Sequence, residues 1–174
     1  STSTGIAPLL HSYTSGRAEV TVNLFGGNLI AKDNNATTDV GAVRIGNNTV
    51  TTTAANCFKA TFNMYGGSIS GGNSQKTGGN LYISIGCQFN MYGGEIFGGK
   101  VGTAGGNVYT DGGTLCLLGG SIYDGTAPAG ADVYANNQMV VGGNAQIREL
   151  YLGGGKPLSV SQQIPFVTGA KIGI

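Results

Sequence analysis

The chain has 174 residues, a length that is typical of one domain. Nine Lys and Arg residues against eight Asp and Glu give a net charge of +1, which excludes the clustered basic face of a dedicated nucleic-acid-binding protein. An apolar fraction of 40% excludes a disordered chain, and no apolar run approaches the roughly 20 residues of a membrane-spanning helix. We therefore expect a single folded domain with no nucleic-acid partner and no membrane insertion.

A repeated sequence follows an N-terminal segment, residues 1–19, that we expect to be irregular. FNMYGG occurs at Phe62–Gly67 and again at Phe89–Gly94, and the related LCLLGG occurs at Leu115–Gly120. The first residues of these copies are 27 and then 26 positions apart. A fixed interval of this length is typical of stacked repeat architectures, and we place the repeat coils at residues 20–152.

Five segments align on their glycine pairs, and their apolar residues recur at alternate positions. The first apolar column is Val22, Phe62, Phe89, Leu115 and Met139. The column two positions later is Leu24, Met64, Met91, Leu117 and Val140, and the column beyond the glycines is Leu29, Ile69, Ile96, Ile122 and Ala145. Alternation with a period of two predicts a β-strand, because a helix needs spacings of three and four.

A second strand is expected in each repeat, after the first. These strands are Val43–Ile45, Leu81–Ile83, Val108–Thr110, Val133–Ala135 and Leu150–Leu152. Corners such as Gly71-Gly72 and Gly98-Gly99 join the two strands into one coil, since glycine adopts the positive φ angles that sharp bends need. Two polar columns, Asn23, Asn63 and Asn90 in the first strand and Asn80, Asn107 and Asp132 before the second, predict ladders of stacked side chains.

These patterns predict an all-β fold, a single-stranded parallel β-helix (β-solenoid) of about six coils. The rival folds are a propeller, whose blades need four strands each, and an antiparallel sandwich, which has no reason to keep identical columns. The first interval between glycine pairs, from Gly26 to Gly66, is 40 residues, about 13 more than the later one, and we assign this excess to polar loops at Lys32–Asp39 and Asn47–Asn56. Residues 153–174 lose the pattern, and we expect them to form an irregular terminal coil of the same domain.

Four short motifs carry a resemblance to a known group of repeats. They are MYGGSI at Met64–Ile69, MYGGEI at Met91–Ile96, GGNLY at Gly78–Tyr82 and GGNVY at Gly105–Tyr109. In these motifs the chain resembles the right-handed β-helix repeats of large cell-surface proteins from clostridia and related gut bacteria. The resemblance implies a right-handed coil and an extracellular location, at the cell surface or after secretion. It implies no activity, because such repeats have no family catalytic residues to match.

Carboxylates offer little support for catalysis. A polysaccharide lyase or hydrolase on this fold would need acids that converge on one outer face. Asp111 and Asp132 are the pair that could lie on neighbouring coils, but they flank opposite ends of their strands. Since Asp is a routine turn former, we interpret both as turn and ladder residues and predict no catalytic residue.

The cysteines and the histidine indicate no metal site and no cofactor. Cys57, Cys87 and Cys116 fall at different places in the repeat and cannot all pair, so we expect buried or half-buried thiols. Alternation places Cys87 inside as a small hydrophobe. His11 is the single histidine, and we expect a surface residue rather than a ligand.

Aromatic residues form two columns that we expect to face outward. The predicted ligand-binding residues are Tyr82, Tyr109, Tyr134 and Tyr151 in one column, and Tyr65 and Tyr92, next to Phe25, in the other. Rows of this kind can stack on sugar rings or support docking by another protein. They can equally stabilise the outside of the sheet, by about 0.5–1 kcal/mol per cross-strand pair.

The sequence therefore predicts a non-enzymatic, extracellular structural or adhesive repeat module, either a rigid surface stalk or a self-associating fibre unit. The expected partners are other copies of the chain, stacked end to end, or surface glycans. The alternative function is a carbohydrate-binding module that uses the tyrosine columns, and a polysaccharide lyase or hydrolase is less favoured.

Overall fold

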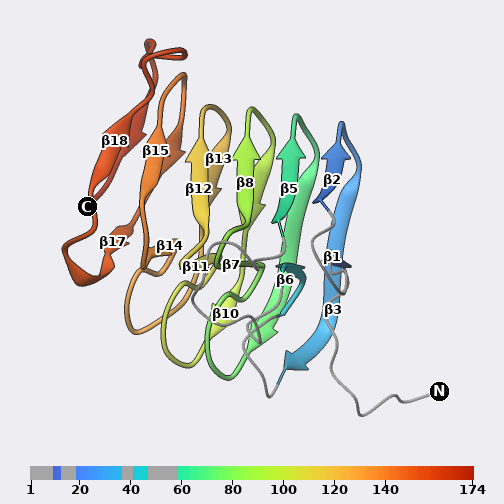
Figure 1. Cartoon of the computed structure of the whole chain (residues 1–174). Helices are drawn as coiled ribbons and strands as arrows, with labels where there is room; N and C mark the ends of the chain where they lie inside the picture. Colours follow the sequence, from blue (N-terminus) through green and yellow to red (C-terminus); the bar gives the residue numbers. More distant parts are fainter. Residues whose placement is uncertain (1–9, 13–18, 37–40, 47–58) are drawn as a thin grey trace.

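The computed structural model describes residues 10–12, 19–36, 41–46 and 59–174, and for 11–12 and 32–36 it describes the backbone only. In these ranges the chain is all-β and contains no α-helix, with one short 3₁₀ turn, η1 (Gly153–Gly155). The strands form three parallel sheets that run the length of the molecule (Figure 1). The predicted all-β class is confirmed.

Three sheets, A, B and C, are built from strands that lie far apart in the sequence. Sheet A has the order β1 (Leu10–Ser12), β4 (Val43–Ile45), β7 (Leu81–Ser84), β11 (Val108–Asp111), β14 (Val133–Ala135) and β17 (Leu150–Leu152). Sheet B has the order β18 (Leu158–Val160), β15 (Met139–Val141), β12 (Thr114–Leu117), β8 (Gln88–Met91), β5 (Lys59–Met64) and β2 (Glu19–Leu24). Sheet C has the order β10 (Lys100–Val101), β6 (Ser68–Ser74), β9 (Glu95–Phe97), β13 (Ser121–Tyr123), β16 (Gln146–Ile147) and β19 (Lys171–Ile172), and β3 (Asn28–Ala36) also pairs with β6.

The chain visits sheets A, B and C in turn and then returns to sheet A. Each strand pairs in parallel with the corresponding strand of the next passage, so that Tyr82 lies beside Tyr109 and Phe62 beside Phe89. The five predicted second strands are the strands of sheet A from β4 to β17. This arrangement of stacked parallel sheets is compatible with a β-solenoid.

Each repeat contains three strands, where the sequence analysis expects two. The predicted first strand continues through the glycine pair, but the structure bends there and places its two halves in sheets B and C. Gly67, Gly94 and Gly120 have φ angles of 84°, 89° and 83°. A Cβ atom added to Gly67 would lie 2.1 Å from the carbonyl oxygen of Gly27. The glycine pair is therefore itself a corner, because the bend needs both a positive φ and a close backbone approach.

The last repeat has a register that differs from the predicted columns. Val141, rather than Val140, pairs with Leu117, and Ile147, rather than Ala145, pairs with Ile122. The predicted columns make this strand one residue shorter than the others, whereas β15 is paired over its whole length. The corner that follows β15 is one residue longer than in the previous repeat, because residues 142–145 lie between β15 and β16 where residues 118–120 lie between β12 and β13.

The excess residues of the first interval are partly inside a strand. Lys32–Asp39 is predicted as a loop, but β3 extends to Ala36. Its register shifts between Ile30 and Asn34, which face Ser70 and Gly72. A bulge of this kind absorbs extra residues while the pairing continues on both sides. The other predicted loop, Asn47–Asn56, lies outside the described residues.

Strand pairing extends beyond the predicted repeat region at both ends. In the segment expected to be irregular, β1 pairs with β4. In residues 153–174, β18 pairs with β15 and β19 pairs with β16. The terminal segment thus continues sheets B and C.

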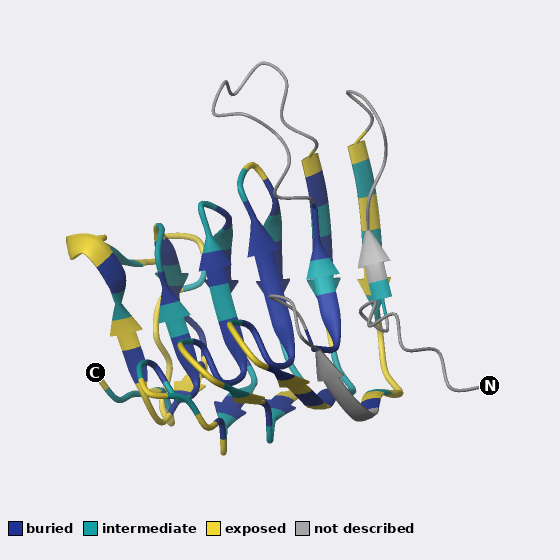
Figure 2. Ribbon diagram, turned by 90° about the horizontal axis from the view of Figure 1, so that it is seen from below, coloured by how far each residue is buried: buried dark blue, intermediate teal, exposed yellow. Residues whose placement is uncertain are grey.

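The core lies between the three sheets and is built from the inward-facing columns. In β5 the buried residues Ala60, Phe62 and Met64 alternate with more exposed ones. The rings of Phe62 and Phe89 stack with their centroids 5.2 Å apart. Figure 2 shows the buried residues along the strands in the middle of the stack, with exposed residues at the turns and the C-terminal end. Cys87 belongs to this core, as alternation predicts.

One core position carries a polar group without a partner. Thr110 is fully buried, in register with Ile83 and Ala135, and its hydroxyl oxygen has no hydrogen-bond partner among the described residues. A buried polar group that loses its bonds to water costs about 1–3 kcal/mol.

We expect Thr110→Val to raise the free energy of unfolding by about 1 kcal/mol, because valine has nearly the same shape and no polar group to desolvate. Urea denaturation followed by circular dichroism measures the change. The matched control is Thr114→Val, at a partly exposed position in β12, for which little change is expected. A destabilised Thr110→Val variant would show that the hydroxyl is bonded in solution.

Candidate functional site

The most exposed aromatic column lies at the corner between sheets B and C. Phe25, Tyr65 and Tyr92 each follow the end of a sheet B strand and precede the glycine pair. Neighbouring ring centroids are 5.1 and 5.0 Å apart, and both pairs are within 8° of parallel. All three side chains are exposed, Phe25 by 75%. The predicted outward column is therefore present as a continuous stack.

A second stack runs along the outer face of sheet A. Its members are Tyr82, Tyr109, Tyr134 and Tyr151, with successive centroid distances of 5.5, 5.3 and 4.9 Å. Tyr151, in the last strand, is 49% exposed, whereas Tyr109 and Tyr134 are half-buried.

Tyr82 is not the exposed residue that the sequence analysis expects, because only 3% of it is accessible. The guanidinium carbon of Arg44 lies 5.1 Å from its ring centroid, on the strand that precedes it. Tyr109 stacks on the ring from the following strand, and the Tyr82 hydroxyl donates a hydrogen bond of 2.7 Å to Oδ2 of Asp111. Tyr82 thus contributes to the stack and offers no open surface to a ligand.

The structure contains a further aromatic pair that is not among the predicted site residues. Phe97 and Tyr123 stack on the outer face of sheet C, 5.4 Å apart and 11° from parallel. They directly follow Ile96 and Ile122, which the sequence analysis places in an apolar column. Extending the alternation by one residue past those isoleucines would have found the pair.

An asparagine ladder lies on the outer face of sheet B, as predicted. Asn63 Nδ2 donates to Asn23 Oδ1 over 2.9 Å, and Asn90 Nδ2 donates to Asn63 Oδ1 over 2.8 Å. Gln88 Nε2 donates to Asn90 Oδ1 and lies 3.6 Å from the sulfur of Cys116. The ladder bonds three successive passages of the chain together.

The second predicted ladder is fully buried at the corner between sheets C and A. Asn80 Nδ2 donates to Asn107 Oδ1 over 2.8 Å, and Asn107 Nδ2 donates to Asp132 Oδ1 over 3.3 Å. The Oδ1 atoms of Asn80, Asn107 and Asp132 each also accept the backbone N–H of a corner glycine at 2.8–2.9 Å. The donors are Gly72, Gly99 and Gly125, respectively. The ladder therefore satisfies corner amides that would otherwise be buried without partners.

Asp132 ends this ladder, because a carboxylate accepts hydrogen bonds and passes none on. Its Oδ2 lies 3.3 Å from Nε of Arg148 and accepts the backbone N–H of Glu149 over 3.0 Å. Arg148 also reaches Oδ1 of Asp124, 3.2 Å away. A buried carboxylate is tolerated when it has both an ion pair and several donors, as here.

The acids considered for catalysis are held by hydrogen bonds within the fold. Asp132 is a ladder residue, and Asp111 accepts the hydroxyl of Tyr82. In the described ranges, no three His, Cys, Asp or Glu side chains form a group that could hold a metal ion. The side chain of His11 lies outside the described part of the chain.

Cys87 and Cys116 are both buried, as the sequence analysis expects, and Cys57 lies outside the described residues. Burial raises the pKa of the Cys116 thiol, and its hydrogen bond with Gln88 opposes that change. A thiol with a raised pKa is mostly protonated near neutral pH and is a poor nucleophile.

Comparisons with known proteins leave the chain without a family assignment. No protein-family model matches it, and neither curated proteins nor solved structures give a significant match. No helix in the part of the chain that the structure describes is long and apolar enough to cross a membrane.

We expect Asn107→Ala to lower the free energy of unfolding by about 3 kcal/mol, because it removes the side-chain partner of the Gly99 N–H and of the Tyr123 carbonyl and one of the two acceptors of the Asn80 amide. Asn63→Ala is the matched control, since it removes a ladder residue that is partly exposed to water. For that variant the expected loss is about 1 kcal/mol or less. Urea denaturation of both variants measures the difference, and equal losses would contradict a special role for the buried ladder.

Proposed function

We propose that this protein is a non-enzymatic, extracellular structural module, a rigid surface stalk or a self-associating fibre unit. In this proposal the three sheets form a right-handed parallel β-helix of about six coils. One observation carries the proposal: residues of the same kind lie beside one another along the stack, both in the core and on the outer faces of the sheets. Side-chain ladders and ring stacks connect successive passages, which is the property that a stiff spacer requires.

The motifs MYGGSI and MYGGEI support an origin in a large bacterial cell-surface protein, since they resemble the repeats of such proteins. The right-handed coil follows from the same resemblance and from the strong preference of parallel strands for right-handed crossovers.

Self-association is supported by the C-terminal end of the stack. Strands β18 and β19 are the outermost described strands of sheets B and C, whereas in β17 the N–H of Leu150 donates to the carbonyl of Gly173 over 2.8 Å. Val160 occupies the inward-facing column of Val141, yet it is 53% exposed. Edge strands with exposed apolar residues pair readily with another chain. An end-to-end contact between copies is heterologous and can therefore extend into a filament.

Light scattering and negative-stain microscopy over a concentration series test the proposal directly. Filaments that lengthen with concentration support a fibre unit, and a stable monomer supports one section of a stalk. Closed oligomers of fixed size, which an end-to-end contact does not produce, would contradict both forms of the proposal.

For the fibre form, we expect Val160→Glu to weaken association at least about tenfold, because the glutamate would place a charge in a buried end-to-end contact. Ser159→Glu is the matched control, since Ser159 is the neighbouring residue in β18 and lies in register with the outward-facing Val140. The weight-average mass by light scattering measures the change. If both variants assemble like the unaltered chain, the contact does not involve this edge.

The alternative is a carbohydrate-binding module, and the exposed column of Phe25, Tyr65 and Tyr92 is the observation that favours it. The rings stack face to face at about 5 Å, so each ring covers much of its neighbour's face. A sugar would therefore meet ring edges and hydroxyl groups along the row rather than a series of open faces.

If this alternative holds, Tyr65→Ala combined with Tyr92→Ala should abolish binding on a glycan array while leaving the circular dichroism spectrum unchanged. Tyr82→Ala is the control, since this tyrosine is buried and offers no surface to a sugar. The absence of any glycan binding by the unaltered chain would exclude the alternative for this column.

A further inference from the structure

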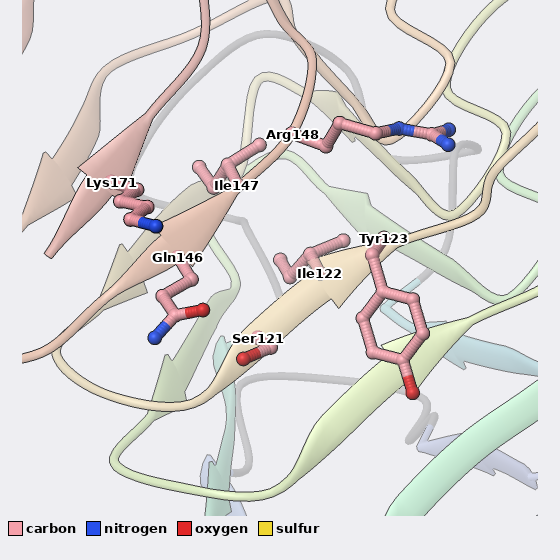
Figure 3. A pocket seen from close by; sticks show the side chains of 7 residues that line it. All are labelled: Ser121, Ile122, Tyr123, Gln146, Ile147, Arg148 and Lys171. Atoms are coloured by element: carbon pink, nitrogen blue, oxygen red, sulfur yellow. The ribbon is translucent and has the colours of Figure 1, made fainter. Parts of the chain in front are cut away.

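A hollow of about 390 Å³ lies on the outer face of sheet C, apart from the aromatic columns of sheet A and of the corner between sheets B and C. It lies over β13, β16 and β19, and Figure 3 shows the side chains that line it. Its volume falls at the lower end of the range for small-ligand sites, about 300–1,000 Å³. The walls combine an aromatic ring with polar and charged groups.

One wall is the ring of Tyr123, which has one face available. Phe97 stacks on the other face, 5.4 Å away. In the longer columns the next strand supplies another ring, but here β16 is followed by Arg148. Asp132 and Asp124 hold the guanidinium of Arg148, at 3.3 and 3.2 Å.

The Gly125 carbonyl accepts a further hydrogen bond from Arg148. Figure 3 shows the Arg148 and Tyr123 side chains extending in different directions. The ring stack therefore ends at Tyr123, because Asp132 of the buried ladder holds the Arg148 side chain away from the tyrosine ring.

Polar groups line the rest of the hollow. Ser121 lies in register between Glu95 and Gln146, and its small side chain leaves room beside the ring. Gln146 in turn lies beside Lys171. A hydroxyl, an amide and an ammonium group thus follow one another across three strands, with both donors and acceptors for the hydroxyls of a sugar.

Charge is distributed unevenly across the hollow. Glu95 and Asp124 lie near the Tyr123 end, where burial, the charge of Glu95, its hydrogen bond and the charge of Asp124 raise the pKa of the Tyr123 hydroxyl. At the opposite end, Lys171 forms no ion pair within the described part of the chain. A ligand with a single carboxylate would therefore bind with that group at the Lys171 end.

We propose that this hollow binds an acidic sugar, a uronate residue of a glycan, with its pyranose ring against Tyr123 and its carboxylate toward Lys171. Ser121 and Gln146 bond to its hydroxyl groups. A ring face that another ring does not cover is the surface that a sugar needs, and Tyr123 provides one beside hydrogen-bonding groups. This site involves none of the tyrosines of the sequence-based prediction, and it does not depend on self-association.

Two disaccharides that differ in one group test the proposal. Cellobiouronic acid carries a carboxylate where cellobiose carries a hydroxymethyl group. Each is titrated into the full ¹⁵N-labelled chain, and amide chemical shifts are followed by NMR. We expect saturable shifts confined to β13, β16 and β19, and affinity about tenfold higher for the acidic sugar. No saturable shift with either sugar, or shifts spread over other strands, would overturn the proposal.

Single-residue variants test the contribution of the Tyr123 ring and that of the Lys171 charge separately. Lys171→Gln should remove the preference for the acidic sugar, and Tyr123→Ala should abolish binding of both. Tyr151→Ala is the matched control, because it removes an exposed tyrosine of sheet A and leaves the hollow intact. Ser121→Tyr fills the hollow without removing Tyr123, so it keeps the test decisive if Tyr123→Ala fails to fold. Unchanged binding in Ser121→Tyr, or in both Tyr123→Ala and Lys171→Gln, would contradict the proposal.

Discussion

The structure depends on parallel pairing in register, which places each residue beside its counterpart from the previous passage of the chain, about 4.8 Å away. At that spacing like side chains interact with one another. Amides form ladders, as in Asn23, Asn63 and Asn90, and rings stack, as in Tyr65 and Tyr92. Inside, phenylalanine, methionine and isoleucine columns fill the space between the sheets. Every strand therefore stabilises the register of its neighbours.

The corners require a second kind of interaction, because three short strands per repeat need frequent bends and leave backbone amides inside. The buried ladder of Asn80, Asn107 and Asp132 accepts those amides and also bonds along the stack. Its position between sheets C and A makes it a link across sheets as well as along them. This ladder thus bonds to corner amides as well as along the stack, whereas the outer ladder on sheet B joins side chains.

Distinct sites arise where the columns stop being uniform. Arg44 ends the tyrosine stack of sheet A by lying on the face of Tyr82. Arg148 ends the short stack of sheet C in another way, since Asp132 holds it away from Tyr123. Arg44 thus covers Tyr82 at the end of its stack, whereas the position of Arg148 leaves one face of Tyr123 exposed. A uniform stack suits a stalk or fibre, whereas an interruption provides the shape and charge that a ligand can recognise.

The sequence by itself determined the all-β class, the sheet A strands from β4 to β17, both asparagine ladders and the two aromatic columns, because repeated alternation specifies which residues face inward and which are stacked. It did not determine that the glycine pair is a corner, that β3 contains a bulge, or that the last repeat aligns Val141 and Ile147 with its predecessors. Those features depend on where the backbone bends, and a glycine pair is compatible with a strand or a turn. Tertiary structure also decided that Tyr82 is covered and Tyr123 is open, because exposure depends on the residue that the neighbouring strand places against each ring.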